Sequence, residues 1–379
     1  MERRSFLIGS LGLAFARASS AIAGPPISNG CIVSPYSHSE GKKLVHGVMI
    51  LDLDRRKMTT IPTPFAIHIV SAGVEKSGLC YGVASYSNHV AKIDLRSAKV
   101  LLVKELSPKF EYSGHSTVSK SGHIYATVSE KSAAKDSDPL RTGLVRLDPV
   151  TMNLDEEYLF PKLDGLGTLH DVQTFSSDGN ILVSAGGSLL IHINLKTKTI
   201  VRSDKIEFDI ARASLNHFAF SSEGNFGLQS RVSDSGAGNG GISKLGAPVL
   251  FDSGNRKFRI LRQTGELSKR LNRDLFGLCL NREGSVLGIA NLWDDFLSFW
   301  NMQSGKLLKS FDLRQPTGIT LSADGKYFLV TTTSGLMYFD SQTLKQVFGL
   351  TDFKKEFGEL FGQTISKGRL FHSTAIFLS

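Results

Sequence analysis

A short hairpin pattern recurs along this chain and constrains its fold more than any other feature. One copy places the tight turn Ser177-Asp178-Gly179 before the apolar strand at residues 181–183. Asp-Gly between two runs of strand-forming residues favours a hairpin, because glycine takes positive φ without a steric clash. The arrangement recurs about seven times, and strong helical periodicity is absent. We therefore expect an all-β repeat fold.

The repeats can be aligned on the residue that opens each unit, and these residues are separated by 41 to 60 positions. They are His68, His115, His170, His217, Gly277, Gly318 and Phe361. A period of roughly 40 to 50 residues with four short strands per unit is typical of propeller blades. The last unit is incomplete, and two strands near residues 45–54 and 57–61 precede the first unit. We predict a seven-bladed β-propeller of the WD40 or YVTN type, closed by N-terminal strands that complete the last blade.

The first residues of the chain indicate export. Arg3 and Arg4 precede Phe6, Leu7 and a short apolar run, and residues 21–23 form an A-x-A cleavage pattern. This pattern predicts a twin-arginine signal peptide over residues 1–23, with an ordinary secretory signal or an uncleaved anchor as alternatives. Residues 24–43 are rich in Gly, Pro and Ser, so we expect a flexible leader, followed by one propeller domain over residues 44–379.

The charge and hydropathy of the chain limit the kinds of partner that we expect. The 379-residue chain has a formal net charge of +9, but its basic residues are scattered and are not interleaved with aromatic residues. This argues against nucleic-acid binding. No run of 18 or more apolar residues predicts a membrane span. We expect a periplasmic monomer with no membrane span after signal cleavage.

Histidines occupy the same place in four consecutive repeats: His68, His115, His170 and His217. In a propeller the first strand of each blade is innermost, so these side chains should converge on the axis at one mouth of the channel. Neutral imidazole binds iron, copper, zinc and nickel, so the histidines are candidate ligands of a transition metal or a haem. Glycine at the fifth and sixth positions would leave room for a ligand. The alternative is that each histidine only hydrogen-bonds its own blade.

Four further residues complete the candidate site. Asp171 and Glu130 could hydrogen-bond to the imidazoles and orient them without binding the metal themselves. Arg212 and Arg231 could contact an anionic ligand. The sequence contains no motif for covalent haem attachment, for a zinc protease or for a dinucleotide fold, and it assigns no catalytic residue.

The sequence around these histidines resembles a domain-of-unknown-function family of twin-arginine-exported bacterial propellers. The resemblance covers roughly residues 44 to 375 and is carried by Gly114-His115, Gly165-Leu166-Gly167 with His170, and Asn216-His217-Phe218. The family's matching motifs are Gly-His-Gly, Pro-His-Glu and Arg-His-Leu. Its members are often encoded beside periplasmic iron-uptake components. The resemblance implies iron handling in the cell envelope, iron as the metal, and iron-uptake proteins as partners.

Three hypotheses for function follow. The first is a metal-binding propeller without catalysis, accessory to iron or metal handling. The second is a lactonase- or lyase-like enzyme with His170 or His217 as general base. The third is a protein-interaction platform that uses the long loops at residues 131–142 and 230–246 and has no small-molecule site.

Overall fold

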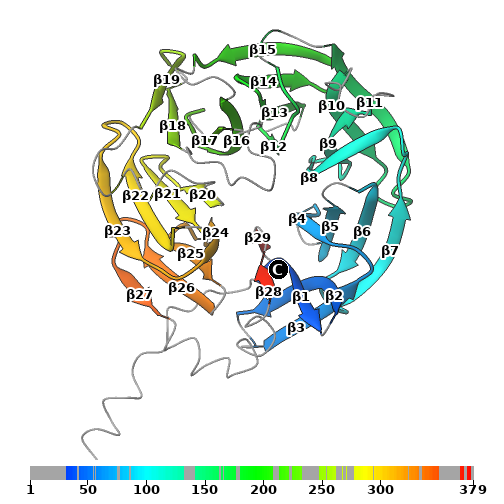
Figure 1. Cartoon of the computed structure of the whole chain (residues 1–379), viewed down its shortest axis with the longest axis horizontal. Helices are drawn as coiled ribbons and strands as arrows, with labels where there is room; N and C mark the ends of the chain where they lie inside the picture. The colour runs from blue at the N-terminus through cyan, green and yellow to red at the C-terminus, as the bar shows by residue number, and fades with distance from the viewer. Residues whose placement is uncertain are drawn as a thin grey trace, which may run out of the picture.

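The computed structural model arranges antiparallel sheets radially around a central axis (Figure 1). It describes residues 31–349, 368–370 and 374–376, apart from 41, 54, 56, 75–76, 85–86, 132–140, 162–163, 165, 176–179, 208–212, 222–223, 233–246, 253, 262–266, 268–269, 271–276, 293, 323 and 333–334. The described residues form seven sheets, and the seven-bladed β-propeller predicted from the repeats is confirmed.

The first three blades follow the chain, each from its innermost strand outwards. Blade 1 contains β4 (Ile67–Ala72), β5 (Leu79–Ala84), β6 (His89–Asp94) and β7 (Lys99–Glu105). Blade 2 contains β8 (Phe110–Val118), β9 (Ile124–Glu130), β10 (Arg141–Leu147) and β11 (Leu154–Pro161). Blade 3 contains β12 (Asp171–Thr174), β13 (Ile181–Gly186), β14 (Leu189–Asn194) and β15 (Thr199–Lys205).

The next three blades repeat this order. Blade 4 contains β16 (Ala213–Phe220), β17 (Phe226–Val232), β18 (Ala247–Asp252) and β19 (Lys257–Ile260). Blade 5 contains β20 (Gly277–Leu280), β21 (Val286–Asn291), β22 (Phe296–Asn301) and β23 (Leu307–Asp312). Blade 6 contains β24 (Pro316–Leu321), β25 (Tyr327–Thr332), β26 (Gly335–Asp340) and β27 (Gln346–Phe348).

Blade 7 is built from both ends of the described chain. It contains β1 (Cys31–Glu40), β2 (Lys43–Asp52), β3 (Lys57–Thr63), β28 (Gly368–Leu370) and β29 (Thr374–Ile376). Both β28 and β29 pair antiparallel with β1, and β29 also contacts β24 and β4 on either side. The two chain ends therefore close the ring between blade 6 and blade 1, as predicted.

The structure corrects the predicted flexible leader over residues 24–43. Residues 31–40 form β1, which pairs with β2 over ten positions from Cys31↔Asp52 to Glu40↔Lys43. Ile32 and Val33 are fully buried against the neighbouring blades. The N-terminal region thus contributes three strands to blade 7, and not the two expected. Pro35, which has no amide hydrogen, lies between the segments of β1 that pair with β28 and β29.

The hairpin turns that define the repeat have the expected geometry. In five blades the glycine between the first and second strand has a φ of 67° to 89°, in the left-handed region. These glycines are Gly78, Gly122, Gly224, Gly284 and Gly325. The turn at Asp178-Gly179 lies outside the described residues.

Hydrophobic side chains pack face to face between the blades. Among the described residues they form seven clusters, one at each boundary between adjacent blades. Trp300, for example, is fully buried between blades 4 and 5 together with Leu287. Full burial of such a side chain contributes about 1.5–3 kcal/mol. The core thus lies between the blades, which leaves the axis to other side chains.

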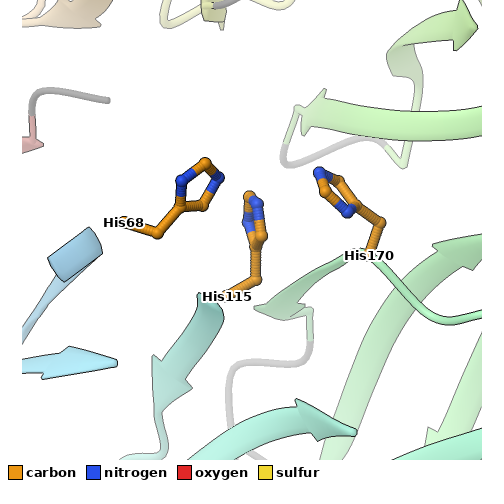
Figure 2. A group of neighbouring side chains, drawn as sticks. All are labelled: His68, His115 and His170. Atoms are coloured by element: carbon orange, nitrogen blue, oxygen red, sulfur yellow. The ribbon is translucent and has the colours of Figure 1, made fainter. Parts of the chain in front are cut away.

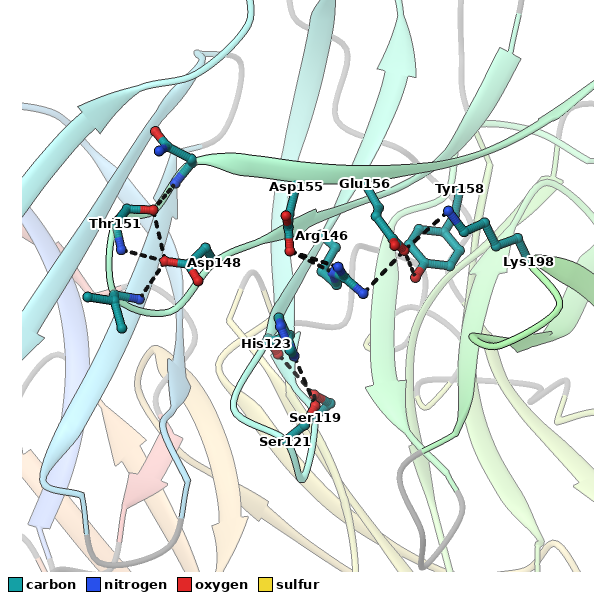
Figure 3. Close-up of polar contacts among 12 residues, drawn as sticks. Ser119, Ser121, His123, Arg146, Asp148, Thr151, Asp155, Glu156, Tyr158 and Lys198 are labelled. Atoms are coloured by element: carbon teal, nitrogen blue, oxygen red, sulfur yellow. Dashed lines mark hydrogen bonds and ion pairs between the residues drawn. The ribbon is translucent and has the colours of Figure 1, made fainter.

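An Asp or Asn side chain closes the turn between the third and fourth strands of blades 1–6. The carboxylate of Asp148 accepts hydrogen bonds from the amides of Val150 (3.1 Å) and Thr151 (2.7 Å), and from Thr151 Oγ1 (2.8 Å; Figure 3). The equivalent residues are Asp94, Asn194, Asp252, Asn301 and Asp340. These side chains are structural turn residues.

The described residues contain no helix long and apolar enough to pass through a lipid bilayer.

Candidate metal centre

The histidines of the first four blades lie at irregular points of the innermost strands. His68, His115 and His217 fall where the register with the second strand shifts, that is, at β-bulges. A bulge adds residues to one strand and redirects a side chain out of the regular alternation. His170 comes directly before β12, and its amide donates to the carbonyl of Ala185 (2.9 Å). Irregular backbone thus positions each imidazole.

Blade 2 shows how the sequence achieves this. Gly114, directly before His115, has a φ of 87°. An L-amino acid with a side chain is strained by about 1–2 kcal/mol in this left-handed region, whereas glycine is not. The Gly114-His115 pair in the sequence is therefore the local signal for the bulge that delivers His115 to the axis.

The four histidines lie together on the axis. Ring centroids are 4.3 Å apart for His115 and His170, 4.8 Å for His170 and His217, and 5.0 Å for His115 and His217. The ring of His68 is 5.0 Å from that of His115 and 6.4 Å from that of His170. Figure 2 shows three of these rings directed toward one another from blades 1, 2 and 3. Possible donor atoms of His68, His115 and His170 lie within 4.8 Å of one another.

Asp171 adds a carboxylate to this cluster. Its Oδ1 is 3.4 Å from Nδ1 of His115, and donor atoms of His115, Asp171 and His217 also lie within 4.8 Å of one another. The carboxylate accepts the amides of Val172 (Oδ1, 2.8 Å) and Phe218 (Oδ2, 3.2 Å). It is thereby held by both blade 3 and blade 4. A carboxylate fixed beside an imidazole selects the orientation and tautomer of a metal-binding histidine.

Burial controls the charge of this cluster. It lowers the pKa of His68 from 6.5 to about 4, a shift that the Asp171 carboxylate partly opposes. Burial, followed by the charge of His68, lowers the pKa of His115 well below 6.5. Burial raises the pKa of Asp171 from 3.8 to about 7, against the hydrogen bonds from Phe218 and Val172. At neutral pH His68 and His115 are therefore neutral imidazoles, the form that binds metal ions.

A chamber of about 390 Å³ lies on the axis beside the histidine cluster. Residues of all six innermost strands of blades 1–6 line it, and Asp171 and His217 border both the chamber and the cluster. Hydroxyl and amide side chains supply much of its polar lining: Ser71, Ser116, Thr117, Gln173 and Thr320. None of the described lining residues is Lys or Arg.

Two hydroxyl side chains that the sequence did not single out support the cluster from behind. Thr127, which is fully buried on β9, has its Oγ1 3.2 Å from the carbonyl oxygen of His115 and 3.3 Å from that of His170. Ser113 Oγ donates to the His170 carbonyl (3.2 Å) and bonds Thr127. Thr127 thus links the backbones of two histidines from adjacent blades. Aligning the second strands of the blades with one another would have pointed to Thr127. Ser184 and Thr331, on the second strands of blades 3 and 6, also donate to carbonyl groups of the innermost strand.

Some of the predicted site residues do not join the cluster. Glu130 lies at the far end of β9, opposite Phe110, and its carboxylate binds Arg141 (2.7 and 2.9 Å), so the prediction that it orients an imidazole is wrong. Arg231 lies in β17 opposite Ser214, and the structure does not describe its side chain. Arg212 and Phe361 lie outside the described residues, as do residues 132–140 and 233–246 of the long loops.

One further histidine is buried but stands apart. His192, on β14, is 4% exposed and packs against Phe175 and Phe226, with ring centroids 5.1 and 6.0 Å away. Its Nε2 has no hydrogen-bond partner among the described residues. His192 therefore belongs to the packing between blades 3 and 4.

Together these features define a β-propeller with an imidazole and carboxylate cluster on its axis. No protein-family model matches the sequence, and no curated protein matches it either. Solved structures match in fold. A chain of hydrazine synthase from Kuenenia stuttgartiensis has a TM-score of 0.60 at 13% identity, over 80% of this chain and 94% of that chain.

Two other solved structures show the same architecture. A putative 6-phosphogluconolactonase from Bacteroides fragilis has a TM-score of 0.60 at 11% identity, over 93% of this chain and 99% of that chain. The β-propeller domain of Cps50 (Swd1) from Myceliophteria thermophila has a TM-score of 0.52 at 13% identity, over 76% and 89% of the two chains. At these identities the likeness establishes the fold alone.

Proposed function

We propose that this protein binds one divalent transition-metal ion on the propeller axis through His68, His115, His170 and His217, with Asp171 orienting His115. The observation that carries this proposal is the convergence of four imidazoles from four consecutive blades, with ring centroids 4.3–6.4 Å apart in the five measured pairs. Imidazole is a ligand suited to zinc, copper, iron and nickel. Packing alone gives no reason to gather four such side chains at one point.

The surroundings of the cluster support an ion at this place. Donor atoms of His115, Asp171 and His217 lie within 4.8 Å of one another, so one cation could contact all three residues. A cation would also offset the cost of burying the Asp171 carboxylate. The same ring spacing leaves room between the imidazoles for an ion rather than for the macrocycle of a haem.

The biological setting is part of the proposal. The twin-arginine pattern and the family resemblance favour a periplasmic protein that handles iron, with iron-uptake proteins of the envelope as partners. Iron is one of the metals that imidazole binds, so the donor set agrees with this role. The function proposed is storage or delivery of the ion without catalysis.

Metal analysis tests the proposal. We expect the exported wild-type protein to contain one transition-metal ion per chain, measured by inductively coupled plasma mass spectrometry. A His115→Ala/His170→Ala variant should lose it. A His89→Ala/His123→Ala variant is the matched control, since His89 contacts Phe65 and His123 bonds Ser121, away from the axis. Equal metal content in the axis variant and wild type, with circular dichroism showing both folded, contradicts the proposal.

A lactonase- or lyase-like activity is the second candidate. It is favoured by the position of Asp171 and His217 on the chamber, where either could act as a general base, and weakly by the fold shared with a putative 6-phosphogluconolactonase. Turnover of a lactone or sugar-acid substrate that is abolished by His217→Ala would support it. A screen of such substrates without turnover argues against it.

A further inference from the structure

We infer that the axial chamber binds a small polyhydroxylated acid of about the size of a hexose, whose single carboxylate coordinates the ion held by the histidines. This inference rests on the proposed function, because the ion supplies one end of the ligand site.

The chamber and the cluster are continuous. Asp171 and His217 belong to one group of candidate donor atoms and also line the chamber. An ion at the cluster therefore has one side that faces the chamber. The other arc of the channel carries Gly277 and Gly318, which also line the chamber and contribute no side chain to fill it. A coordination position toward the chamber is thus open to a ligand from outside.

The charges of the lining restrict that ligand. Asp171 is the carboxylate among the described lining residues, and none of these residues is Lys or Arg. A carboxylate on the ligand can therefore be neutralised at the ion and at no other described position. A second anionic group elsewhere in the chamber would find no Lys or Arg among the described lining residues to offset its loss of hydration. Phosphorylated sugars fit this lining poorly.

The uncharged part of the lining suits hydroxyl groups. Ser71 and Ser116 line the chamber and share a hydrogen bond between their side chains (2.7 Å). Ser71 Oγ also donates to the carbonyl of Ser116 (2.7 Å), so both hydroxyl hydrogens are engaged and acceptor lone pairs remain on each oxygen. Gln173 donates to the carbonyl of Phe218 (2.8 Å), so its amide is fixed in place and its oxygen can accept. Thr320 lies on the opposite wall. Convergent neutral acceptors of this kind can bind the hydroxyl groups of a polyol, which act as donors.

The volume is consistent with such a ligand. Small-molecule pockets have volumes of about 300–1,000 Å³. The chamber, at about 390 Å³, lies at the lower end of this range. It therefore suits one compact molecule.

Cobalt(II) provides a spectroscopic test. The full mature chain is stripped of metal with a chelator and loaded with cobalt(II), whose visible spectrum responds to a change of ligand. Gluconate and 6-phosphogluconate are then titrated separately, with calorimetry in parallel. We expect gluconate to change the spectrum and to bind the loaded protein at least tenfold more tightly than the metal-free protein. We expect 6-phosphogluconate to bind at least tenfold more weakly than gluconate.

One chamber variant completes the experiment. Thr320→Tyr adds bulk on the wall away from the histidines, so it should keep full cobalt uptake and lose at least tenfold in gluconate affinity. Wild-type protein that takes up no cobalt contradicts the proposed function. Protein that takes up cobalt but binds neither acid, or binds 6-phosphogluconate as tightly as gluconate, overturns this inference alone. Unchanged gluconate affinity in Thr320→Tyr also overturns it.

Discussion

The two sides of the central channel use the same strand architecture differently. Blades 1–4 carry a histidine in or directly before the innermost strand, whereas the repeat aligns Gly277 and Gly318 with these histidines in blades 5 and 6. Blade 6 nevertheless keeps a register shift at this point, next to Thr317, whose Oγ1 donates to the carbonyl of Thr331 (3.3 Å) within the same blade. A register shift at this point of a blade therefore does not by itself require a histidine.

Packing between neighbouring blades explains why glycine is found at Gly277. A Cβ atom added at Gly277 would lie 2.9 Å from the backbone nitrogen of Ile319 and 3.1 Å from the Cα of Gly318. Glycine is thus required by the close approach of blades 5 and 6. On the other side, the fully buried His115 lies beside a carboxylate and three other imidazoles. This gathering of donor groups supports the proposal that the histidines bind an ion.

The prediction with the largest expected effect compares the axial histidines with His192, a histidine that is buried by packing. Burial, together with the positive charge of Arg202, lowers the pKa of His192 from 6.5 to about 4; Asp204 opposes this shift and Arg256 adds to it. The unfolded chain therefore binds a proton near pH 6.5 that the folded chain does not bind until about pH 4. The free energy of unfolding should fall as the pH drops through this window, with His192 contributing about 3 kcal/mol.

A His192→Phe variant isolates this contribution. Urea unfolding at pH 7.5 and pH 4.5 should show a smaller acid-induced loss in the variant than in wild type, by roughly 2–3 kcal/mol. Its metal content should equal that of wild type, because the side chain packs among phenylalanines away from the axis. Loss of metal from this variant would remove the distinction between the axial histidines and a histidine buried for packing.

The next prediction compares two equivalent threonines. Thr127 Oγ1 lies within hydrogen-bond distance of the carbonyls of His115 and His170, and Thr331 Oγ1 donates to the carbonyl of Gly318 (3.3 Å). Replacing either residue by Val keeps the shape, removes the donor and should destabilise the fold by about 1–3 kcal/mol. Only Thr127→Val should also weaken metal binding, by about 10- to 100-fold, because it loosens two ligand backbones.

Competition with a chromophoric chelator measures both affinities. Equal metal affinity in Thr127→Val and Thr331→Val, at matched stability, would show that the carbonyl hydrogen bond has only a structural role on both sides of the channel.

The sequence predicts the ring and the axial cluster because both follow from periodicity. Once Asp-Gly type turns mark seven units, a residue at one place in each unit must return to the same radius. His115 and His217 therefore lie close together, with ring centroids 5.0 Å apart, despite their separation in the chain. Turn glycines such as Gly122 have the left-handed φ that the pattern requires. These predictions need only the repeat length and the steric freedom of glycine.

The remaining features depend on tertiary contacts that no local pattern reveals. The β1 strand escapes prediction because Pro35 and its Ser neighbours resemble a loop, although β2 and the C-terminal strands pair with it. Thr127 reads as an ordinary strand residue until blade 3 places the carbonyl of His170 beside it. The chamber is enclosed by six blades at once, so its neutral polar lining emerges only when the ring closes.

The prediction with the smallest expected effect concerns Asp171 and Glu130, two carboxylates for which the sequence predicts the same role. Asp171 is held by the amides of Val172 and Phe218 beside His115, whereas Glu130 binds Arg141 at the far end of its strand. Glu130→Gln should leave metal content unchanged and shift the urea midpoint only slightly, because exposed ion pairs contribute little. Asp171→Asn, measured in parallel, should weaken metal binding about 10- to 100-fold, because the neutral amide lacks the negative charge that raises the basicity of the imidazole and offsets the charge of the ion. Equal metal affinities in the two variants would mean that the position of Asp171 beside His115 has no influence on the ion.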